Sequence, residues 1–331
     1  MRTEGSTRRS GKIRCLAALL TLALLLSGCA AAEKPGAPQT ALDKTAAYLQ
    51  ESVPEPAPGS VGGEWRVLGL ARSGLEVPEA YFTGYYDRLC ARLDEQQGVL
   101  DTRRSTEYSR TILALTALGH DPADAADYDL TAPLGDFAWV SGQGVNGVIW
   151  ALIALDSGNY TVADAETGAP DVRERYLQAL LDAQNEDGSW GLMPGTADAD
   201  LTAMALQALA AHLAQPEAQA AADRGIAALA QQQETDGGFL AWGEGSSESV
   251  AQAIVALSAL GISMDDARFI KNSATLSDVL MRFALEDGSF SHTQGGESDQ
   301  MATEQAFYAL TALARAEDGK TALYDMTDVV K

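Results

Sequence analysis

The hydrophobic positions of this 331-residue chain repeat as a small–large motif, Ala-Leu-x-Ala-Leu, which begins at Ala114, Ala151, Ala205, Ala256 and Ala309. A degenerate copy begins at Gly69. Each motif lies in a run that is apolar on nearly every side, as is typical of buried helices. The small Ala side chains let one face of the helix approach a neighbouring helix closely, and the Leu side chains pack against other neighbours on another face. We therefore expect six inner helices.

Amphipathic segments alternate with these runs and predict an outer layer of helices. They span residues 41–51, 78–96, 121–136, 171–184, 216–233 and 273–285. The 121–136 segment is the weakest, because Pro122 and Pro133 interrupt it. No stretch has a convincing strand pattern. Six inner and six outer helices in alternation predict an all-α fold, an α6/α6 toroid without significant β-sheet; an open helical solenoid is the alternative.

The turns between the two layers share a pattern of their own. Residues 184–191 read Gln-Asn-Glu-Asp-Gly-Ser-Trp-Gly, with weaker copies at 233–239 and 286–290. Asp-Gly ends a helix because glycine readily adopts the left-handed conformation, and Trp190 then offers a large ring to pack beneath the turn. These turns resemble the QW repeat of squalene and hopene cyclases. The resemblance implies that residues 42–323 form a toroid like those of the terpenoid cyclase and protein prenyltransferase superfamily, with a site in the central cavity.

The first residues carry a targeting signal. Basic residues precede an apolar run, 15–26, that is too short for an ordinary membrane span, and the run ends in Leu-Ser-Gly-Cys29. This ending resembles the lipobox of bacterial lipoproteins, which implies cleavage before Cys29 and lipidation of its thiol. We therefore expect a signal peptide (1–28), a flexible tether (29–39) and one toroid domain (40–331), anchored by lipid outside the cytoplasm on the bacterial cell membrane. A plain secretory signal is the alternative.

Charge and cysteine content narrow the function classes. Residues 29–331 contain 18 Lys and Arg and 45 Asp and Glu, which gives a net charge of −27. Such a surface repels nucleic acid, so we expect no nucleic-acid partner. Of the three cysteines, Cys15 would leave with the signal peptide and Cys29 would carry the lipid, so Cys90 has no partner for an intramolecular disulfide in the mature chain. His120, His212 and His292 are scattered, so we expect no metal site and interpret His292 as a surface histidine.

This chain has only part of the catalytic residues of the enzymes that it resembles. Squalene-type cyclases use an Asp-x-Asp-Asp run whose middle Asp, kept protonated, starts the reaction; here the matching run is Asp198-Ala199-Asp200-Leu201, without the last acid. Prenyltransferases of the superfamily hold zinc with Asp, Cys and His, and the sequence has no such set. We therefore favour a non-catalytic role. If the protein is an enzyme, Asp198 or Asp200 is the acid; helix capping is the alternative role.

A second resemblance concerns the ligand. Residues 200–209, Asp-Leu-Thr-Ala-Met-Ala-Leu-Gln-Ala-Leu, resemble the Asp-Thr-x-Ala-Met-Ala run of the animal cobalamin carriers intrinsic factor and transcobalamin, although Leu201 intrudes. The wider chain is also similar to bacterial prenyltransferase and squalene oxidase repeat proteins. The resemblance implies a corrinoid ligand. Because the carriers cover their ligand with a small β domain, it also implies a covering partner domain or a transporter.

Polar residues form columns near the predicted starts of the inner helices. Five positions before the first Ala of each motif stand Glu64, Ser109, Asn146, Asp200, Ala251 and Glu304; the next column is Trp65, Arg110, Gly147, Leu201, Gln252 and Gln305. Inner helices of such a ring run parallel, so these ends should meet at one mouth, where their N–H groups favour acceptors on a ligand. Capping and local backbone bonds are the alternative.

These columns and the neighbouring aromatic residues define a candidate pocket. Its predicted ligand-binding residues are Glu64, Trp65, Tyr108, Arg110, Asn146, Trp150, Asp200, Gln252, Glu304, Gln305 and Tyr308. The leading hypothesis is non-catalytic binding of a bulky small molecule, with a corrinoid taken up beside a transporter as the specific case. The alternatives are an isoprenoid cyclase or prenyltransferase-like enzyme, and a cell-surface module that binds a glycan or a protein.

Overall fold

The computed structural model describes residues 38–59 and 61–329, so the predicted signal peptide and Cys29 lie outside the described residues. The toroid forms the compact unit Pro38–Lys331. Its regular structure is almost entirely α-helical. Within the described residues, no helix is both long and apolar enough to cross a membrane.

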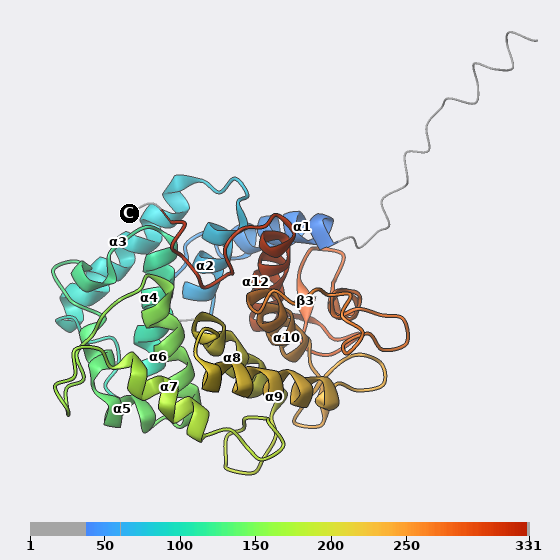
Figure 1. Ribbon diagram of the computed structural model, residues 1–331. Helices are drawn as coiled ribbons and strands as arrows, with labels where there is room; N and C mark the ends of the chain where they lie inside the picture. Colours follow the sequence, from blue (N-terminus) through green and yellow to red (C-terminus); the bar gives the residue numbers. More distant parts are fainter. Residues whose placement is uncertain (1–37, 60, 330–331) are drawn as a thin grey trace, which may run out of the picture. The chain divides into compact units, whose positions relative to one another are not determined.

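The inner helices close into a ring (Figure 1). In the described chain they are α2 (Glu64–Ser73), α4 (Ser105–Ala117), α6 (Val145–Ser157), α8 (Ala199–Leu209), α10 (Ser247–Ala259) and α12 (Gln300–Glu317). Each packs on the next in sequence, and α12 returns to pack on α2. This last contact confirms the predicted toroid and excludes the open solenoid.

Ring closure explains why the first copy of the small–large motif is degenerate. A Cβ atom on Gly69 of α2 would lie 2.9 Å from Cδ1 of Phe307 in α12, which is closer than side chains tolerate. Phe307 is fully buried at this contact. Glycine therefore replaces the alanine of the other copies because α2 and α12 approach so closely here.

The outer layer is less regular than predicted. Four expected segments form full helices, α1 (Pro38–Ser52), α3 (Glu79–Gln96), α7 (Arg173–Asp182) and α9 (Pro216–Gln232). The prediction of a helix over 121–136 is wrong: this segment holds the 3₁₀ turns η1 (Pro122–Asp124) and η2 (Ala132–Gly135), and the short α5 (Phe137–Ser141) follows. Pro122 and Pro133 each stand at the first positions of a turn, where proline is tolerated but cannot extend a helix already begun.

The segment 273–285 is also shorter than predicted, with α11 (Leu276–Leu280) followed by η4 (Met281–Phe283). Asn272 and Ser273 have positive φ angles, and Thr275 then forms a capping box with Asp278, so the helix cannot begin earlier. Two antiparallel pairs of two-residue strands accompany the turns. They are β1 (Leu240–Ala241) with β2 (Glu244–Gly245), and β3 (Phe290–Ser291) with β4 (Ser298–Asp299).

The repeated turns share one construction. The Asp187 carboxylate accepts bonds from the N–H and the hydroxyl of Ser189 at 2.9 and 2.6 Å, and Asp287 accepts the same pair from Ser289 at 3.0 and 2.6 Å. The Trp190 N–H then donates to the Thr202 hydroxyl of α8 at 3.0 Å. The aromatic residues of the three turns, Trp190, Phe239 and Phe290, are fully buried. Each turn therefore anchors one outer segment to the following inner helix.

Candidate functional site

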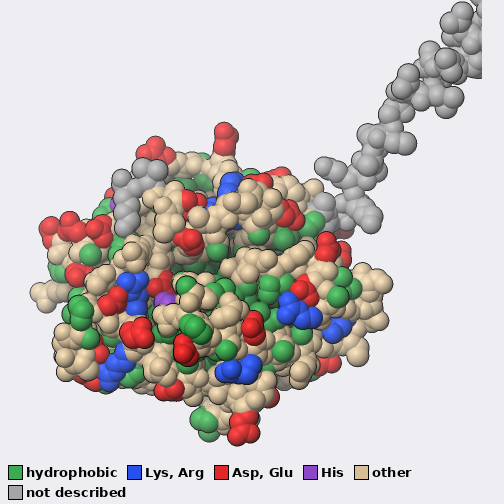
Figure 2. All heavy atoms as spheres, in the orientation of Figure 1, with side chains coloured by type: hydrophobic (Ala, Val, Ile, Leu, Met, Phe, Trp, Pro, Cys, Tyr) green, Lys and Arg blue, Asp and Glu red, His purple; other side chains and the backbone are tan. Residues whose placement is uncertain are grey.

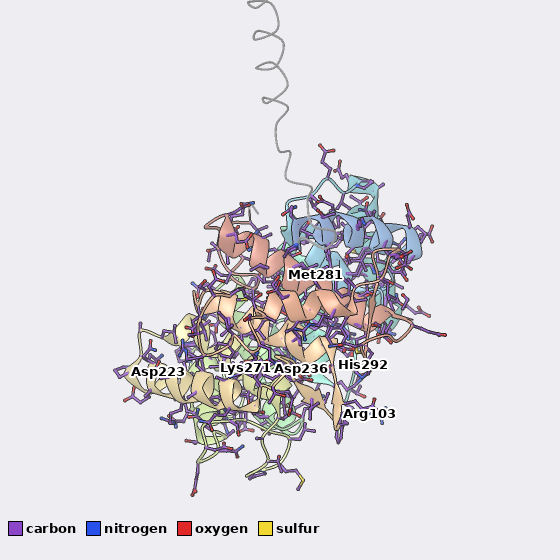
Figure 3. All side chains as sticks on the ribbon, turned by 90° about the vertical axis from the view of Figure 1, so that its right-hand side faces the viewer. Arg103, Asp223, Asp236, Lys271, Met281 and His292 are labelled. Carbon is purple, nitrogen blue, oxygen red and sulfur yellow. The ribbon has the colours of Figure 1, made fainter. Side chains whose placement is uncertain are left out.

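The first residues of neighbouring inner helices lie at one end of the ring, which we call the N-terminal mouth. Glu64 begins α2, and its Oε2 lies 3.0 Å from Nε of Arg110 in α4. The Ser247 N–H, at the start of α10, donates to the His292 carbonyl in the turn before α12 at 3.0 Å. Figure 3 views the ring from the side, and the labelled Arg103 and His292, which precede inner helices, lie on the same side.

The two glutamates of the first predicted column already have partners within the protein. Glu64 accepts bonds from the Gly59 N–H at 2.7 Å and the Tyr85 hydroxyl at 3.2 Å, besides its ion pair with Arg110. Glu304 forms an ion pair with Arg66 at 3.1 Å. Burial raises the pKa of Glu304 to about 7, although Arg66 acts in the opposite direction. Both glutamates therefore stabilise the ring, whatever else they bind.

Other members of the predicted set hold the loops at this mouth. The Tyr108 hydroxyl accepts a bond from the Leu100 N–H at 3.0 Å, and its ring packs edge-on against Trp139. Arg110 also forms an ion pair with Glu107, one turn earlier in α4. Asn146, near the start of α6, is half-buried. These contacts stay within the loops and helix starts, as the alternative of capping and local bonds expects.

Five of the predicted residues instead meet inside the ring, in a group that we call the amide–aromatic cluster. With one residue that the sequence analysis missed, Gln207, it comprises Trp65, Trp150, Gln207, Gln252, Gln305 and Tyr308. The Gln207 side-chain amide donates to the Gln252 backbone and side-chain oxygens at 3.0 and 2.9 Å. The Gln252 amide donates to Gln305 at 2.9 Å and to Tyr308. The column alignment missed Gln207 because it lies further along α8.

The aromatic members of the cluster pack on one another. The ring centroids of Trp65 and Trp150 are 4.9 Å apart, and those of Trp65 and Tyr308 are 6.0 Å apart. Trp150 and Tyr308 are buried, whereas Trp65 is partly exposed. The cluster therefore combines apolar faces with amide groups, the combination that binding pockets for small molecules use.

The two aspartates of the incomplete acid run have different environments. Asp198 is the N-cap of α8 and accepts the Leu201 N–H at 2.9 Å. Asp200, two residues later, has one carboxylate oxygen that is buried and has no hydrogen-bond partner among the described residues. Burial raises the pKa of Asp200 to about 6; Ser249 lowers it, while Asp198 and Glu248 raise it. Of these two aspartates, Asp200 is therefore the one whose pKa the fold shifts.

A second carboxylate lies beside Asp200 at the N-terminal mouth. Glu248, in the first turn of α10, accepts a bond from Nδ1 of His292 at 2.7 Å and bonds of 3.1 Å from the Ser246 and Ser247 hydroxyls. Glu248 is buried, whereas the His292 side chain is 48% exposed. The sequence reading of His292 as a surface histidine missed this pairing, because the two residues are 44 positions apart.

Comparison with protein families assigns the chain to a family. Residues 143–331, more than half of the sequence, match the family described as the prenyltransferase alpha-alpha toroid domain. The chain belongs to this family. The match agrees with the closed ring of inner helices. No curated protein matches the sequence of this toroid family member significantly.

Solved structures share the toroid fold at low sequence identity. The unsaturated glucuronyl hydrolase of Bacillus sp. GL1 is 14% identical, with a TM-score of 0.54 over 87% of this chain and 98% of the hydrolase. The type II terpene cyclase MstE from Scytonema is 16% identical, with a TM-score of 0.57 over 84% of this chain and 99% of the cyclase. At these identities the similarity shows the fold alone. The described part of this toroid has no group of three or more His, Cys, Asp or Glu side chains suited to a metal ion.

Exposed apolar side chains surround the N-terminal mouth of this toroid. Every large hydrophobic side chain that is exposed in the described residues lies in a segment leading into an inner helix or at its start; they are Val61, Val99, Leu192, Met193, Leu240, Trp242 and Met301. We call this set the apolar rim. Trp242 is 95% exposed at the tip of the β1–β2 hairpin. The same segments carry the exposed acids Glu186, Glu234, Glu244, Glu286 and Glu297.

Proposed function

We propose that this protein is an extracytoplasmic, lipid-anchored binding protein that holds a bulky small molecule at the N-terminal mouth of its toroid, with a corrinoid as the ligand. The observation that carries the proposal is the unpaired, buried carboxylate oxygen of Asp200 beside the amide–aromatic cluster. Asp200 and Gln207 of the cluster stand seven residues apart in α8, so both lie on the same face of this helix. An unpaired buried acceptor is costly unless a ligand donates to it.

A corrinoid suits this chemistry because it carries amide groups around an apolar ring. Its amides would donate to Asp200 and exchange bonds with Gln305, which is partly exposed, while Trp65 would cover part of the ring. The lipid anchor of the proposal rests on the sequence around Cys29. It would keep the binding protein beside a membrane transporter.

The apolar rim supports a protein partner over the mouth. Exposed apolar patches rimmed by polar groups mark interaction sites. The glutamates interspersed with the rim would repel an anionic lipid surface and favour a partner whose docking face carries basic side chains around an apolar centre. The partner would be a transporter or a covering domain.

Acid catalysis by Asp200 is the second candidate function. A carboxyl group with a pKa of about 6 is partly protonated near neutral pH and can donate a proton, as general acids do. Asp198 is less suited, because its carboxylate caps α8. The toroid fold shared with a terpene cyclase and a glucuronyl hydrolase makes either an isoprenoid or a sugar a candidate substrate.

We expect cobalamin at one hundred times its Kd to raise the thermal midpoint of residues 38–331 by about 5 °C, because binding to the folded state alone adds about 2.7 kcal/mol. Asp200→Ala and Gln252→Ala should remove most of this shift. Asp198→Asn, which retains the helix cap, is the matched control and should leave the shift intact. Differential scanning fluorimetry with cobalamin, cobinamide and a polyprenyl diphosphate measures these shifts.

The same titration separates the candidates. A shift with the polyprenyl diphosphate alone would contradict corrinoid binding and favour the enzyme, which a product assay with Asp200→Asn would then test. No shift with any compound would favour the interaction module for a glycan or a protein. Under the corrinoid proposal, binding should weaken as the pH falls from 7.5 to 5, because protonation of Asp200 removes the acceptor.

A further inference from the structure

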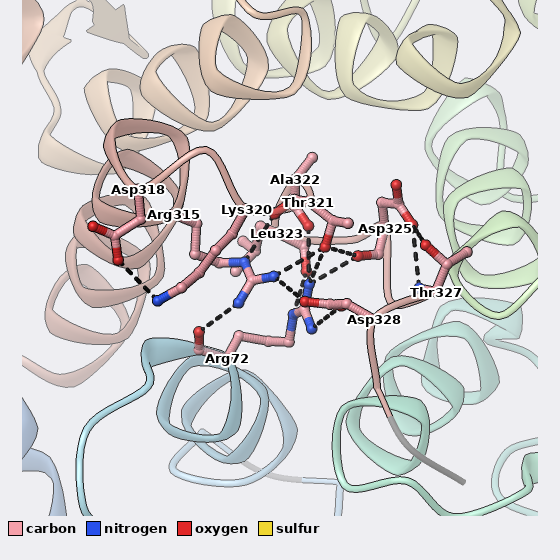
Figure 4. Close-up of polar contacts among 10 residues, drawn as sticks. All are labelled: Arg72, Arg315, Asp318, Lys320, Thr321, Ala322, Leu323, Asp325, Thr327 and Asp328. Atoms are coloured by element: carbon pink, nitrogen blue, oxygen red, sulfur yellow. Dashed lines mark hydrogen bonds and ion pairs between the residues drawn. The ribbon is translucent and has the colours of Figure 1, made fainter.

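The opposite end of the ring is covered by the last part of the chain, residues 318–329, which we call the C-terminal segment. In Figure 1 it crosses in front of α2 and α12. Two buried arginines hold it, as Figure 4 shows. Arg72 donates to the carbonyls of Leu323 and Asp325 at 3.1 and 2.8 Å, and Arg72 and Arg315 each lie 2.6 Å from a carboxylate oxygen of Asp328. The segment is therefore a fixed part of the fold.

A cavity of about 480 Å³ lies between this segment and the C-terminal ends of α6, α8 and α10. Ile153, Ala208, Val255 and Leu323 form apolar parts of its wall. Figure 2 shows this face of the molecule, which is hollowed beside the C-terminal segment. Cavities of 300–1,000 Å³ with apolar walls and few polar groups are typical of sites for small molecules.

Two residues of the lining each carry one buried polar atom that has no partner among the described residues. These atoms are Oε1 of Gln207 and the hydroxyl of Tyr324, on side chains from residues that are only 6% and 8% exposed. The Gln207 amide nitrogen donates twice to Gln252, which fixes the orientation of Oε1. The Tyr324 ring packs edge-on against Trp150, with centroids 5.9 Å apart. Both unpaired atoms are thus held in place by neighbouring contacts.

The charged residues of the lining, apart from Asp325, form ion pairs; the Asp325 carboxylate accepts the N–H and the hydroxyl of Thr327 at 3.2 and 2.6 Å. Asp156 lies 2.7 Å from Nε2 of His212 and 3.3 Å from Arg173, and Arg173 is also 2.6 Å from Asp171. The unpaired groups that remain are an acceptor, Oε1 of Gln207, and a hydroxyl. The ends of α6, α8 and α10 add partial negative charge on the same side. The cavity therefore favours a ligand with hydrogen-bond donors on an apolar body.

We propose that this cavity is a second small-molecule site, which binds an apolar primary amine by hydrogen bonds to Gln207 and Tyr324. The ammonium group donates to Oε1 of Gln207 and to the Tyr324 oxygen, and the apolar body contacts Ile153, Val255 and Leu323. The site lies at the end of the ring opposite Asp200. It does not rest on the proposed function, although Gln207 and Trp150 link its wall to the amide–aromatic cluster.

The test compares three probes that share one body: 4-phenylbutylamine, 4-phenylbutanol and 4-phenylbutyrate. Isothermal titration calorimetry of residues 38–331 should give the tightest binding for the amine and about tenfold weaker binding for the alcohol, which has a single donor and no charge. The carboxylate should bind weaker still, because it offers only acceptors. Equal or tighter binding of the carboxylate would overturn the proposal.

Variants locate the bound amine. Tyr324→Phe removes one hydroxyl and should weaken amine binding about tenfold, and Gln207→Leu should do the same. Tyr48→Phe removes an exposed hydroxyl from α1 and is the matched control, with no expected change. Amine binding that neither Tyr324→Phe nor Gln207→Leu weakens would contradict the proposal. If Gln207→Leu fails to fold, Tyr324→Phe decides the question alone.

Discussion

Arg66→Leu is expected to lower the free energy of unfolding by about 3–5 kcal/mol, because removing one partner of a buried ion pair leaves the other charge uncompensated. Arg66 is fully buried and forms an ion pair with Glu304 of α12 at 3.1 Å. It also donates to the Leu49 carbonyl of α1 at 2.6 Å. One guanidinium therefore joins the first outer helix, the first inner helix and the last inner helix, where the ring closes.

The loss of stability caused by Arg66→Leu should depend on pH. Burial raises the pKa of Glu304 to about 7 in the folded protein, above its ordinary value of 4.5. A carboxyl group with a raised pKa reduces stability as the pH rises from its unfolded pKa through its folded pKa. Without Arg66 the pKa of Glu304 should rise further, so the destabilisation by Arg66→Leu should be larger at pH 8 than at pH 5.

Urea unfolding at both pH values measures this difference. The matched control is Arg66→Leu combined with Glu304→Gln, which removes the buried charge and should recover part of the lost stability at pH 8. Equal losses at pH 5 and pH 8, with no recovery in the double variant, would show that Arg66 acts through packing alone.

The inner ring could be predicted from sequence because its signal is local. Each inner helix is apolar on nearly every side and repeats the same small–large motif, so periodicity alone identifies it. The prediction of the outer layer failed where local backbone conformation prevailed over the apolar pattern. Pro122 and Pro133 stand at the starts of 3₁₀ turns, and the positive φ angles of Asn272 and Ser273 delay α11.

The polar interior was harder to predict, because its pairs form only when the ring closes. The columns correctly placed Gln252 and Gln305 on neighbouring helices, and the two side chains do form a hydrogen bond. No sequence pattern indicated that Arg66 would meet Glu304, 238 positions away. Tyr324 was missed for a similar reason: its segment has no periodicity, and contacts distant in sequence, such as those of Arg72 and Arg315, bring it over the ring.

Trp190→Ala is expected to lower the free energy of unfolding by about 3–5 kcal/mol, the usual cost of removing a fully buried aromatic ring. Trp190 is fully buried, and its indole N–H donates to the Leu180 carbonyl of α7 at 2.9 Å. Trp242→Ala is the matched control, because Trp242 is 95% exposed and should change stability by less than about 0.5 kcal/mol. Urea unfolding of both variants makes the comparison, and equal losses would contradict the role of the turn as an anchor.

Gly225 provides a stricter test of the same packing. A Cβ atom at Gly225 of α9 would lie 2.8 Å from the Trp190 ring, so Gly225→Ala should cost about 1–3 kcal/mol despite the better helix propensity of alanine. In the Trp190→Ala background the contact with the ring is gone, but Cδ2 of Leu206 at 2.9 Å remains, so the same substitution should cost less without becoming stabilising. A double-mutant cycle would measure this coupling. Additive effects would mean that α9 does not rest on Trp190, whereas a clearly smaller cost in the Trp190→Ala background would establish that the turn tryptophan helps to set the spacing between the outer helix and the ring.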